Sequence, residues 1–254
     1  MLTKDTAALF GIEAFEDYAY IERNLEAVRT RLAAAAARGK NAVPTLIAVT
    51  KSATDDEVRA LVAAGVDAIA ENRPQLFTAR AAILDGMADA AARAGLTFRT
   101  PDIHLIGTLQ TNKVKYVVER AASIQSLDSE KLAAEIEKQA AKRGVTVRVL
   151  IEVNSGREEA KGGLMPEDVR AFAEGLAAYP NLVPQGLMTM GPDCEDPEDY
   201  RPYFRLTRAL AEELSAAGLL PASPILSMGM SGSYEVAAEE GATHVRVGRT
   251  LFAR

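Results

Sequence analysis

Apolar and polar positions near the start of the chain alternate with the period of an α-helix. Within residues 13–37 the apolar positions recur at steps of three and four, so they share one face of a helix. They are Ile21, Leu25, Val28 and Leu32. Gly39 follows as a natural stop. The pattern predicts an N-terminal helical segment, 1–40, whose apolar face packs on the rest of the fold.

The period then changes at residues 45–50, a short and nearly all-apolar run rich in β-branched side chains. Such a run is typical of a strand that is buried on both faces. Thr54 is followed three residues later by Glu57, the spacing of a capping box, so a helix is expected to begin there. Gly65 is expected to end that helix.

The unit of a strand followed by a helix then repeats along the chain. Further predicted strands are 67–70, 103–106, 123–126, 146–153, 184–188, 225–227 and 244–247, and further predicted helices are 73–93, 111–119, 128–143, 166–178, 198–217 and 232–240. Eight strands alternating with helices indicate a parallel sheet wrapped by helices, and roughly 250 residues is the usual size of a (β/α)8 TIM barrel. We expect one barrel domain over 1–254, with a doubly wound open sheet as the alternative.

Composition and charge narrow the class of protein. Apolar residues make up 48% and charged residues 25% of the chain, and the formal net charge is −6. This balance excludes a disordered chain and disfavours nonspecific binding to nucleic acid. The single cysteine, Cys194, forms no internal disulfide, and the first residues lack a signal-peptide pattern. The apolar runs are too short for a membrane span. We expect a soluble cytoplasmic protein, a monomer or weak dimer.

Chemistry in a parallel barrel lies at the C-terminal ends of the strands. Lys51 directly follows the first predicted strand and, by alternation, shares a face with Ile47 and Val49. Apolar neighbours would desolvate this lysine and free its amine as a nucleophile for a Schiff base with a carbonyl compound. The alternative is a strand-end lysine that simply reaches solvent.

Asn72 follows the second predicted strand and either binds a ligand or caps the helix that begins near Pro74. His104 and His244 begin their strands, at the end of the barrel away from chemistry, so we interpret both as packing residues. They are well separated in sequence and, with Cys194, show no metal-ligand spacing. No metal site is predicted.

The loops after the seventh and eighth strands are small and rich in glycine. The first contains Met228, Ser231 and Gly232 before a helix, and the second contains Gly248, Arg249 and Thr250. Backbone N–H groups at such turns, together with the Ser231 hydroxyl, would cradle an anion. Many barrels bind phosphate with these two loops, so we expect a phosphate site there; the alternative is two ordinary glycine turns.

Arg246 lies inside the eighth predicted strand. A charge in a buried strand is costly unless it is paired. We therefore expect a partner, either a carboxylate such as Glu152 or Glu71, which would make Arg246 structural, or a ligand atom. A nucleophilic lysine, a phosphate cradle and a buried arginine together match what pyridoxal 5'-phosphate needs: an aldehyde to tether, a phosphate to hold and a ring nitrogen to partner.

Six motifs, in order along nearly the whole chain, resemble the family of pyridoxal phosphate homeostasis proteins (YggS/PLPBP). They are Leu46-Ile-Ala-Val-Thr-Lys51, Glu71-Asn-Arg-Pro-Gln75, His104-Leu-Ile-Gly-Thr-Leu-Gln-Thr-Asn-Lys113, Gly186-Leu-Met188, Ser227-Met-Gly-Met-Ser231 and Val245-Arg-Val-Gly248. The resemblance implies an alanine-racemase-type barrel that holds pyridoxal phosphate as a Schiff base and carries or regulates the cofactor, with apoenzymes that need it as possible partners.

By position, the resemblance assigns the cofactor lysine to Lys51 and a place near the ring to Asn72. Ser231, Gly248 and the backbone around them match the phosphate cradle, Arg246 matches an arginine near the ring nitrogen, and Met228 is placed near the ring or the phosphate. The sequence departs from the family pattern at Leu76, Ala160, Gly232-Ser233 and Ala253. None of these departures removes the lysine or the cradle.

Two other functions fit the same residues. A racemase of the same cofactor would need an acid–base group on each face of the substrate, and Lys51 can serve only one face. A barrel enzyme acting on a sugar phosphate would use Lys51 as an aldolase-type Schiff base and needs no partner for a ring nitrogen. A pyridoxyl adduct on the protein after reduction would exclude the enzyme acting on a sugar phosphate.

Overall fold

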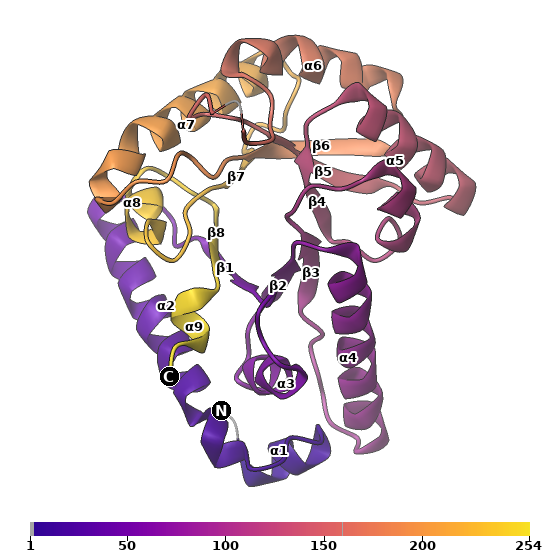
Figure 1. The fold of residues 1–254 in the computed structure, drawn as a ribbon, viewed down its shortest axis with the longest axis vertical. Helices are drawn as coiled ribbons and strands as arrows, with labels where there is room; N and C mark the ends of the chain where they lie inside the picture. The colour runs from indigo at the N-terminus through magenta and orange to yellow at the C-terminus, as the bar shows by residue number, and fades with distance from the viewer. Residues whose placement is uncertain (1–2, 159) are drawn as a thin grey trace.

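A computed structural model describes residues 3–158 and 160–254, and its strands close into a parallel barrel in sequence order. The strands are β1 (Thr45–Val49), β2 (Ala68–Glu71), β3 (Asp102–Leu105), β4 (Ser123–Leu127), β5 (Val147–Glu152), β6 (Leu182–Met188), β7 (Ile225–Ser227) and β8 (His244–Val247). Figure 1 shows them as a ring around the barrel axis. The predicted (β/α)8 barrel is confirmed, and the open sheet is wrong because β1 pairs with β8.

The helices form a layer outside the ring of strands (Figure 1). The α-helices are α1 (Lys4–Leu9), α2 (Ala19–Gly39), α3 (Asp55–Ala63), α4 (Pro74–Arg93), α5 (Glu130–Arg143), α6 (Val169–Gly175), α7 (Arg201–Ala216), α8 (Tyr234–Glu239) and α9 (Arg249–Phe252). Short 3-10 helices are η1 (Phe15–Tyr18), η2 (Thr111–Tyr116), η3 (Pro166–Asp168), η4 (Leu176–Ala178) and η5 (Pro197–Tyr200).

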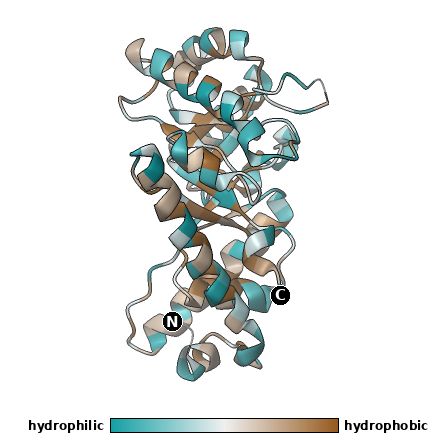
Figure 2. Cartoon of the chain, turned by 90° about the vertical axis from the view of Figure 1, so that its left-hand side faces the viewer, coloured by the Kyte–Doolittle hydropathy of each residue, from teal (hydrophilic) through white to brown (hydrophobic). Residues whose placement is uncertain are grey.

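Side chains of each strand alternate between two apolar environments. Leu46, Ala48 and Ile69 point outward and belong to the large core between strands and helices. Ile47 and Ala68 point inward, where they form a smaller cluster inside the barrel. Figure 2 shows the resulting hydropathy, with apolar strands at the centre and more polar helices around them. This alternation decides which residues can reach the interior at the mouth of the barrel.

Local sequence signals explain the helix ends. The capping box at α3 is confirmed: the Glu57 N–H donates to the Thr54 hydroxyl, and the Glu57 carboxylate accepts from the Thr54 N–H at 2.7 Å. The predicted helix over 13–37 divides into η1 and α2, next to Ala14 in a left-handed conformation. The segment 111–119 forms only the 3-10 helix η2. The helix α1 lies within the predicted helical segment 1–40 but precedes the periodic stretch 13–37.

The long helix α2 packs against α8 and α9, on the side of the barrel where the chain closes. The Asn24 side chain donates to the carbonyls of Leu251 and Ala253, at 3.2 and 2.7 Å. The Asn41 side chain donates to the Glu239 carbonyl at 2.8 Å. The N-terminal segment therefore supports the helix that follows β7. Among residues 3–158 and 160–254, no helix is both long and apolar enough to cross a membrane.

Candidate functional site

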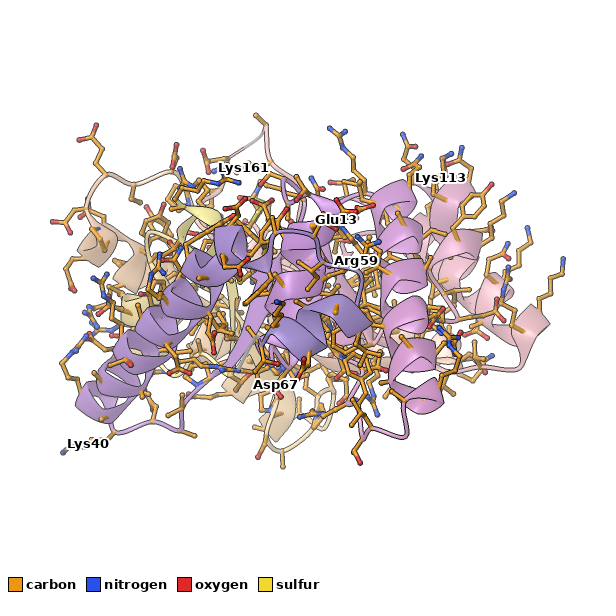
Figure 3. All side chains as sticks on the ribbon, turned by 90° about the horizontal axis from the view of Figure 1, so that it is seen from below. Glu13, Lys40, Arg59, Asp67, Lys113 and Lys161 are labelled. Atoms are coloured by element: carbon orange, nitrogen blue, oxygen red, sulfur yellow. The ribbon has the colours of Figure 1, made fainter. Side chains whose placement is uncertain are left out.

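The two ends of the barrel carry different residues. Figure 3 shows Lys113 and Lys161, which follow β3 and β5, at one end of the molecule, and Lys40 and Asp67, which precede β1 and β2, at the other. The first end is the C-terminal mouth of the parallel strands, where barrel enzymes place their chemistry. The predicted site residues Lys51, Asn72 and Ser231 also follow strands at this end.

Lys51 lies in an exposed turn two residues beyond the end of β1. The expectation that apolar neighbours desolvate it is wrong, because β1 ends at Val49 and the Lys51 side chain is exposed. The Ala53 N–H donates to the Thr50 carbonyl at 3.0 Å and closes this turn. No described residue forms an ion pair or hydrogen bond with the Lys51 ammonium. The amine is therefore free to meet a ligand at the mouth.

Asn72 is not the helix cap that the sequence allowed as an alternative. The residue that caps α4 is Arg73, and the cap involves no side-chain hydrogen bond. Oδ1 of Asn72 is buried without a partner among the described residues. Asn72 borders a cavity of about 250 Å3, also lined by Gln75, Thr108 and Lys113. An unpartnered buried acceptor at the barrel mouth favours the interpretation of Asn72 as a ligand-binding residue.

The two predicted phosphate loops meet above β7 and β8. The Gly248 N–H donates to the Ser231 hydroxyl at 3.3 Å. Ser231, Gly232 and Thr250 line one cavity of about 310 Å3, together with Arg31 and Arg38 of α2. Sequence reasoning missed these two arginines because they lie about 200 positions earlier in the chain. The same cavity is lined by Glu198, Glu235 and Glu239, and Arg38 pairs with Glu239 at 2.7 Å. The donors that an anion would use are therefore the hydroxyls and turn backbone of the two loops.

Met228 and Arg249, two further members of the predicted site, also lie outside the lining of that cavity. Arg249 is exposed on the first turn of α9. Met228 is fully buried and belongs to the large hydrophobic core. Their roles toward a ligand remain predictions.

Arg246 is buried inside the barrel, and its hydrogen-bond partners are neutral oxygens. Its guanidinium donates to the Ser227 hydroxyl at 2.8 Å and to the Thr189 carbonyl at 2.9 Å. Glu71 is not its partner, since that carboxylate binds Arg80 on the outer side of β2. Burial lowers the pKa of Arg246 to about 10, and the negative charge of Glu152 opposes the shift. The arginine therefore carries its charge at neutral pH.

Glu152, at the end of β5, is buried beside Asp128 and within electrostatic reach of Arg246. Burial, with a smaller contribution from the Asp128 charge, raises the pKa of Glu152 to about 7, whereas Arg246 lowers it. The two carboxylates approach one another near Gly162, where an added Cβ would lie 3.4 Å from Asp128 Oδ2 and 3.9 Å from Glu152 Oε1. Glu152 therefore has a pKa close to neutrality at this mouth.

The opposite mouth holds a larger cavity of about 670 Å3, lined in part by Asp102, His104 and His244. His104 bonds the Ser123 hydroxyl through Nδ1 at 2.8 Å, and His244 bonds Thr243 at 2.9 Å. Burial lowers the pKa of both imidazoles to about 4. The interpretation of both as packing residues agrees with these contacts. In the part of the chain that the structure describes, no group of three or more ligating side chains could hold a metal ion.

The residues at the C-terminal mouth fit a ligand that combines an aldehyde, an anionic group and an aromatic nitrogen. Lys51 presents an unpaired amine, and the loops around Ser231 and Gly248 offer hydroxyl and backbone donors to an anionic group. β8 pairs with β1, with Arg246 opposite Ile47, so the arginine lies on the inward face beside the strand that leads to Lys51. Pyridoxal 5'-phosphate has all three groups.

Comparison with known proteins agrees with this site. Residues 17–253 match the family model "Alanine racemase, N-terminal domain". The pyridoxal phosphate homeostasis protein of Aquifex aeolicus is 42% identical over 217 residues, which cover 85% of this chain and 89% of that protein. The human pyridoxal phosphate homeostasis protein is 33% identical over 241 residues, which cover 90% of this chain and 84% of the human protein.

Solved structures give the same grouping. PipY of Synechococcus elongatus, solved with pyridoxal phosphate bound, has a TM-score of 0.76 and 29% identity over 92% of this chain and 100% of PipY. Alanine racemase of Corynebacterium glutamicum shares the fold, with a TM-score of 0.67 and 15% identity over 93% of this chain and 61% of the racemase. The chain belongs to the alanine racemase N-terminal domain family, among the pyridoxal phosphate homeostasis proteins.

Proposed function

We propose that this protein binds pyridoxal 5'-phosphate through a Schiff base with Lys51 and serves in intracellular homeostasis of the cofactor, without catalytic turnover. Relatives that cover most of the chain are named for that homeostasis, and PipY holds the same cofactor. We further propose that the acceptors of the cofactor are apoenzymes that require it.

The observation that carries the proposal is the closeness of the unpaired lysine's turn to the two predicted phosphate loops. A Cβ added to Gly248 would lie 3.1 Å from the carbonyl oxygen of Val49, the last residue of β1. Gly248 also donates to Ser231 in the phosphate loop. The cradle therefore abuts the strand that presents Lys51, so one small molecule can contact both.

The bound cofactor would supply an aldehyde that reacts reversibly with an amine. The neutral Lys51 amine would bond to the aldehyde carbon, and its two N–H protons would leave with the aldehyde oxygen as water. Ser231 and the backbone of the two loops hold the phosphate during this exchange. Water can reverse the reaction at an exposed turn, which suits a carrier.

Arg246 favours binding over turnover. If the ring nitrogen lies against Arg246, the guanidinium would donate a hydrogen bond to it and oppose its protonation, and the ring would be a weaker electron sink than one paired with a carboxylate. Racemisation would in addition need an acid–base group opposite Lys51. The carrier therefore remains the first proposal and the racemase the second.

The test is the absorbance spectrum of the protein with added pyridoxal phosphate, for wild type beside Lys51→Ala. We expect visible absorbance in the wild type only, and a borohydride-stable pyridoxyl adduct at Lys51 by mass spectrometry. Lys115→Ala is the matched control, because this lysine is exposed on η2. A colourless wild type with no adduct would overturn covalent binding. If the wild type racemises alanine and Lys51→Ala does not, the racemase proposal would replace the carrier proposal.

A further inference from the structure

The turn that presents Lys51 is held from behind by one buried arginine. Arg80 of α4 is only 3% exposed. Its NH2 group donates to the Ala53 carbonyl at 2.6 Å and to the Thr50 carbonyl at 3.5 Å. These two carbonyls flank Lys51 and Ser52, the two exposed corners of the turn. One guanidinium nitrogen therefore holds both ends of the turn.

The rest of the same guanidinium ties the turn to both neighbouring elements. Its NH1 group pairs with Asp55, the first residue of α3. Its Nε donates to Oε1 of Glu71 at 3.3 Å, and that oxygen also accepts from the Thr50 hydroxyl at 2.6 Å. The turn before α3 is thus connected to β2 and to α4 through one planar group.

This arrangement is costly to bury, and packing alone does not require it. Glu71 is 0% exposed, and its second oxygen, Oε2, has no partner among the described residues. A buried ion pair is weak evidence for stability, because apolar side chains of similar size often do as well. What apolar side chains cannot supply is a fixed set of hydrogen bonds to the carbonyls on both sides of Lys51.

We propose that Arg80, oriented by Glu71, is a positioning residue that aims the Lys51 amine at the aldehyde of a ligand held in the phosphate cradle. The inference rests on the proposed function, since it concerns the covalent step at Lys51. Arg80 acts through the backbone of the turn and touches no ligand. Loss of orientation at a reacting atom can reduce a reaction by a factor of about 100 for a displacement of about 1 Å.

The test compares two ligands that share the ring and the phosphate. Pyridoxal phosphate has the aldehyde, whereas pyridoxine phosphate has an alcohol in its place and cannot bond to Lys51. The ratio of their dissociation constants isolates the contribution of the lysine. In Arg80→Met we expect the preference for pyridoxal phosphate to fall about tenfold. The affinity for pyridoxine phosphate should stay within about twofold of wild type, because the cradle is untouched.

Two variants refine the result. Arg80→Lys keeps the charge but has no planar fork to reach both carbonyls and Glu71, so its preference should fall to an intermediate value. This variant carries the test if Arg80→Met does not fold. Arg59→Met is the matched control. Arg59 lies on α3 and pairs with Asp56 at 2.6 Å, and no hydrogen bond joins it to the turn. Both affinities should be unchanged in it.

The outcomes separate the two proposals. An unchanged preference in Arg80→Met and Arg80→Lys would overturn the role of Arg80, and so would an equal fall in both affinities, which indicates general loosening. Equal affinities of the wild type for the two ligands, with no trapped adduct, would instead overturn the covalent bond to Lys51. A fall confined to pyridoxal phosphate, together with slower borohydride trapping at Lys51, supports the positioning role.

Discussion

The guanidinium of Arg246 and the hydroxyl of Ser227 are joined by a hydrogen bond of 2.8 Å inside the barrel. Ser227 in turn donates to Gln125 Oε1 at 2.7 Å, and Gln125 donates to the Ser123 hydroxyl at 3.3 Å. A chain of neutral polar groups therefore extends from the arginine across the barrel interior toward His104. This chain holds the Arg246 guanidinium in place through neutral hydrogen-bond partners.

Ser227→Ala should destabilise the protein more than a typical buried serine substitution. The change removes a neutral acceptor from a buried cation and leaves Gln125 Oε1 without its donor, which costs about 1–3 kcal/mol. The measurement is the free energy of unfolding in urea. Ser126→Ala is the control, since that hydroxyl donates only to the Gly107 carbonyl and its loss should cost about 1 kcal/mol. Equal losses in both variants would contradict this account of Arg246.

Much of the fold could be predicted because it depends on local pattern. The capping box at Thr54 and the strand before Lys51 are each readable within a few residues, and the alternation of strands and helices then indicates a barrel. The acceptors of Arg246 were not predictable in this way. Ser227 is 19 positions away and Thr189 is 57 positions away, so only the closed barrel brings them together.

The prediction of an apolar environment around Lys51 was wrong for a related reason. Strand alternation placed its side chain correctly only as far as the strand continues, and β1 ends two residues earlier. A signal for Arg80 did exist: it occurs on the apolar stripe of α4 with Phe77, Leu84 and Met87. A charged residue on such a stripe indicates a buried partner, but which carboxylate it meets depends on how α4 packs against β2 and α3.

Gly229→Ala should weaken the phosphate cradle. Gly229 has a φ of +89°, and an added Cβ would lie 2.4 Å from the Cβ of Ala237 and 3.1 Å from the Cα of Tyr234. Both the strained φ and the close approach of α8 oppose a side chain. We expect the affinity for pyridoxine phosphate to fall about tenfold or more, with a loss of about 1–3 kcal/mol in the free energy of unfolding.

The matched control for that substitution is Gly86→Ala in α4, where an added Cβ meets nothing within 4 Å. Alanine in a helix interior should raise stability by about 0.5–1 kcal/mol and leave the affinity for pyridoxine phosphate unchanged. A Gly229→Ala protein that binds this ligand as tightly as the Gly86→Ala protein would show that α8 need not approach the loop so closely.

Acid should destabilise the protein through His104. Its pKa is lowered from 6.5 to about 4 in the folded state, mainly by burial and also by His244 nearby. Between these values the unfolded chain binds more protons, so stability rises with pH across that window and is lost as pH falls. The loss from pH 7 to pH 4 is up to about 3 kcal/mol for this group.

His104→Asn removes this titration and keeps a polar atom that can bond to Ser123. We expect urea unfolding to show a smaller loss of stability between pH 7 and pH 4.5 in the variant than in the wild type. The comparison is the difference between the two proteins at each pH, because other groups titrate in both. Parallel curves would mean that His104 has the same pKa in the folded and the unfolded protein.

Glu152→Gln should have the opposite dependence on pH. The folded pKa of Glu152 is about 7, above its ordinary value of 4.5, so the folded state binds the extra proton between these values. Its contribution to stability is therefore present at low pH and is lost as pH rises through 7. Glutamine resembles the protonated acid and does not ionise. The variant should gain stability relative to wild type, by up to about 3 kcal/mol, on going from pH 5 to pH 8.

The control for this last substitution is Glu213→Gln, which removes an exposed ion pair with Arg170 of 2.9 Å. Because both side chains are exposed, loss of this pair should change the free energy of unfolding little. If Glu152→Gln follows the same flat curve, the carboxylate is already ionised at pH 5, and Arg246 then outweighs the combined effect of burial and Asp128. A rising curve for Glu152→Gln alone means that this mouth of the barrel holds a proton near neutral pH, within reach of the ligand site.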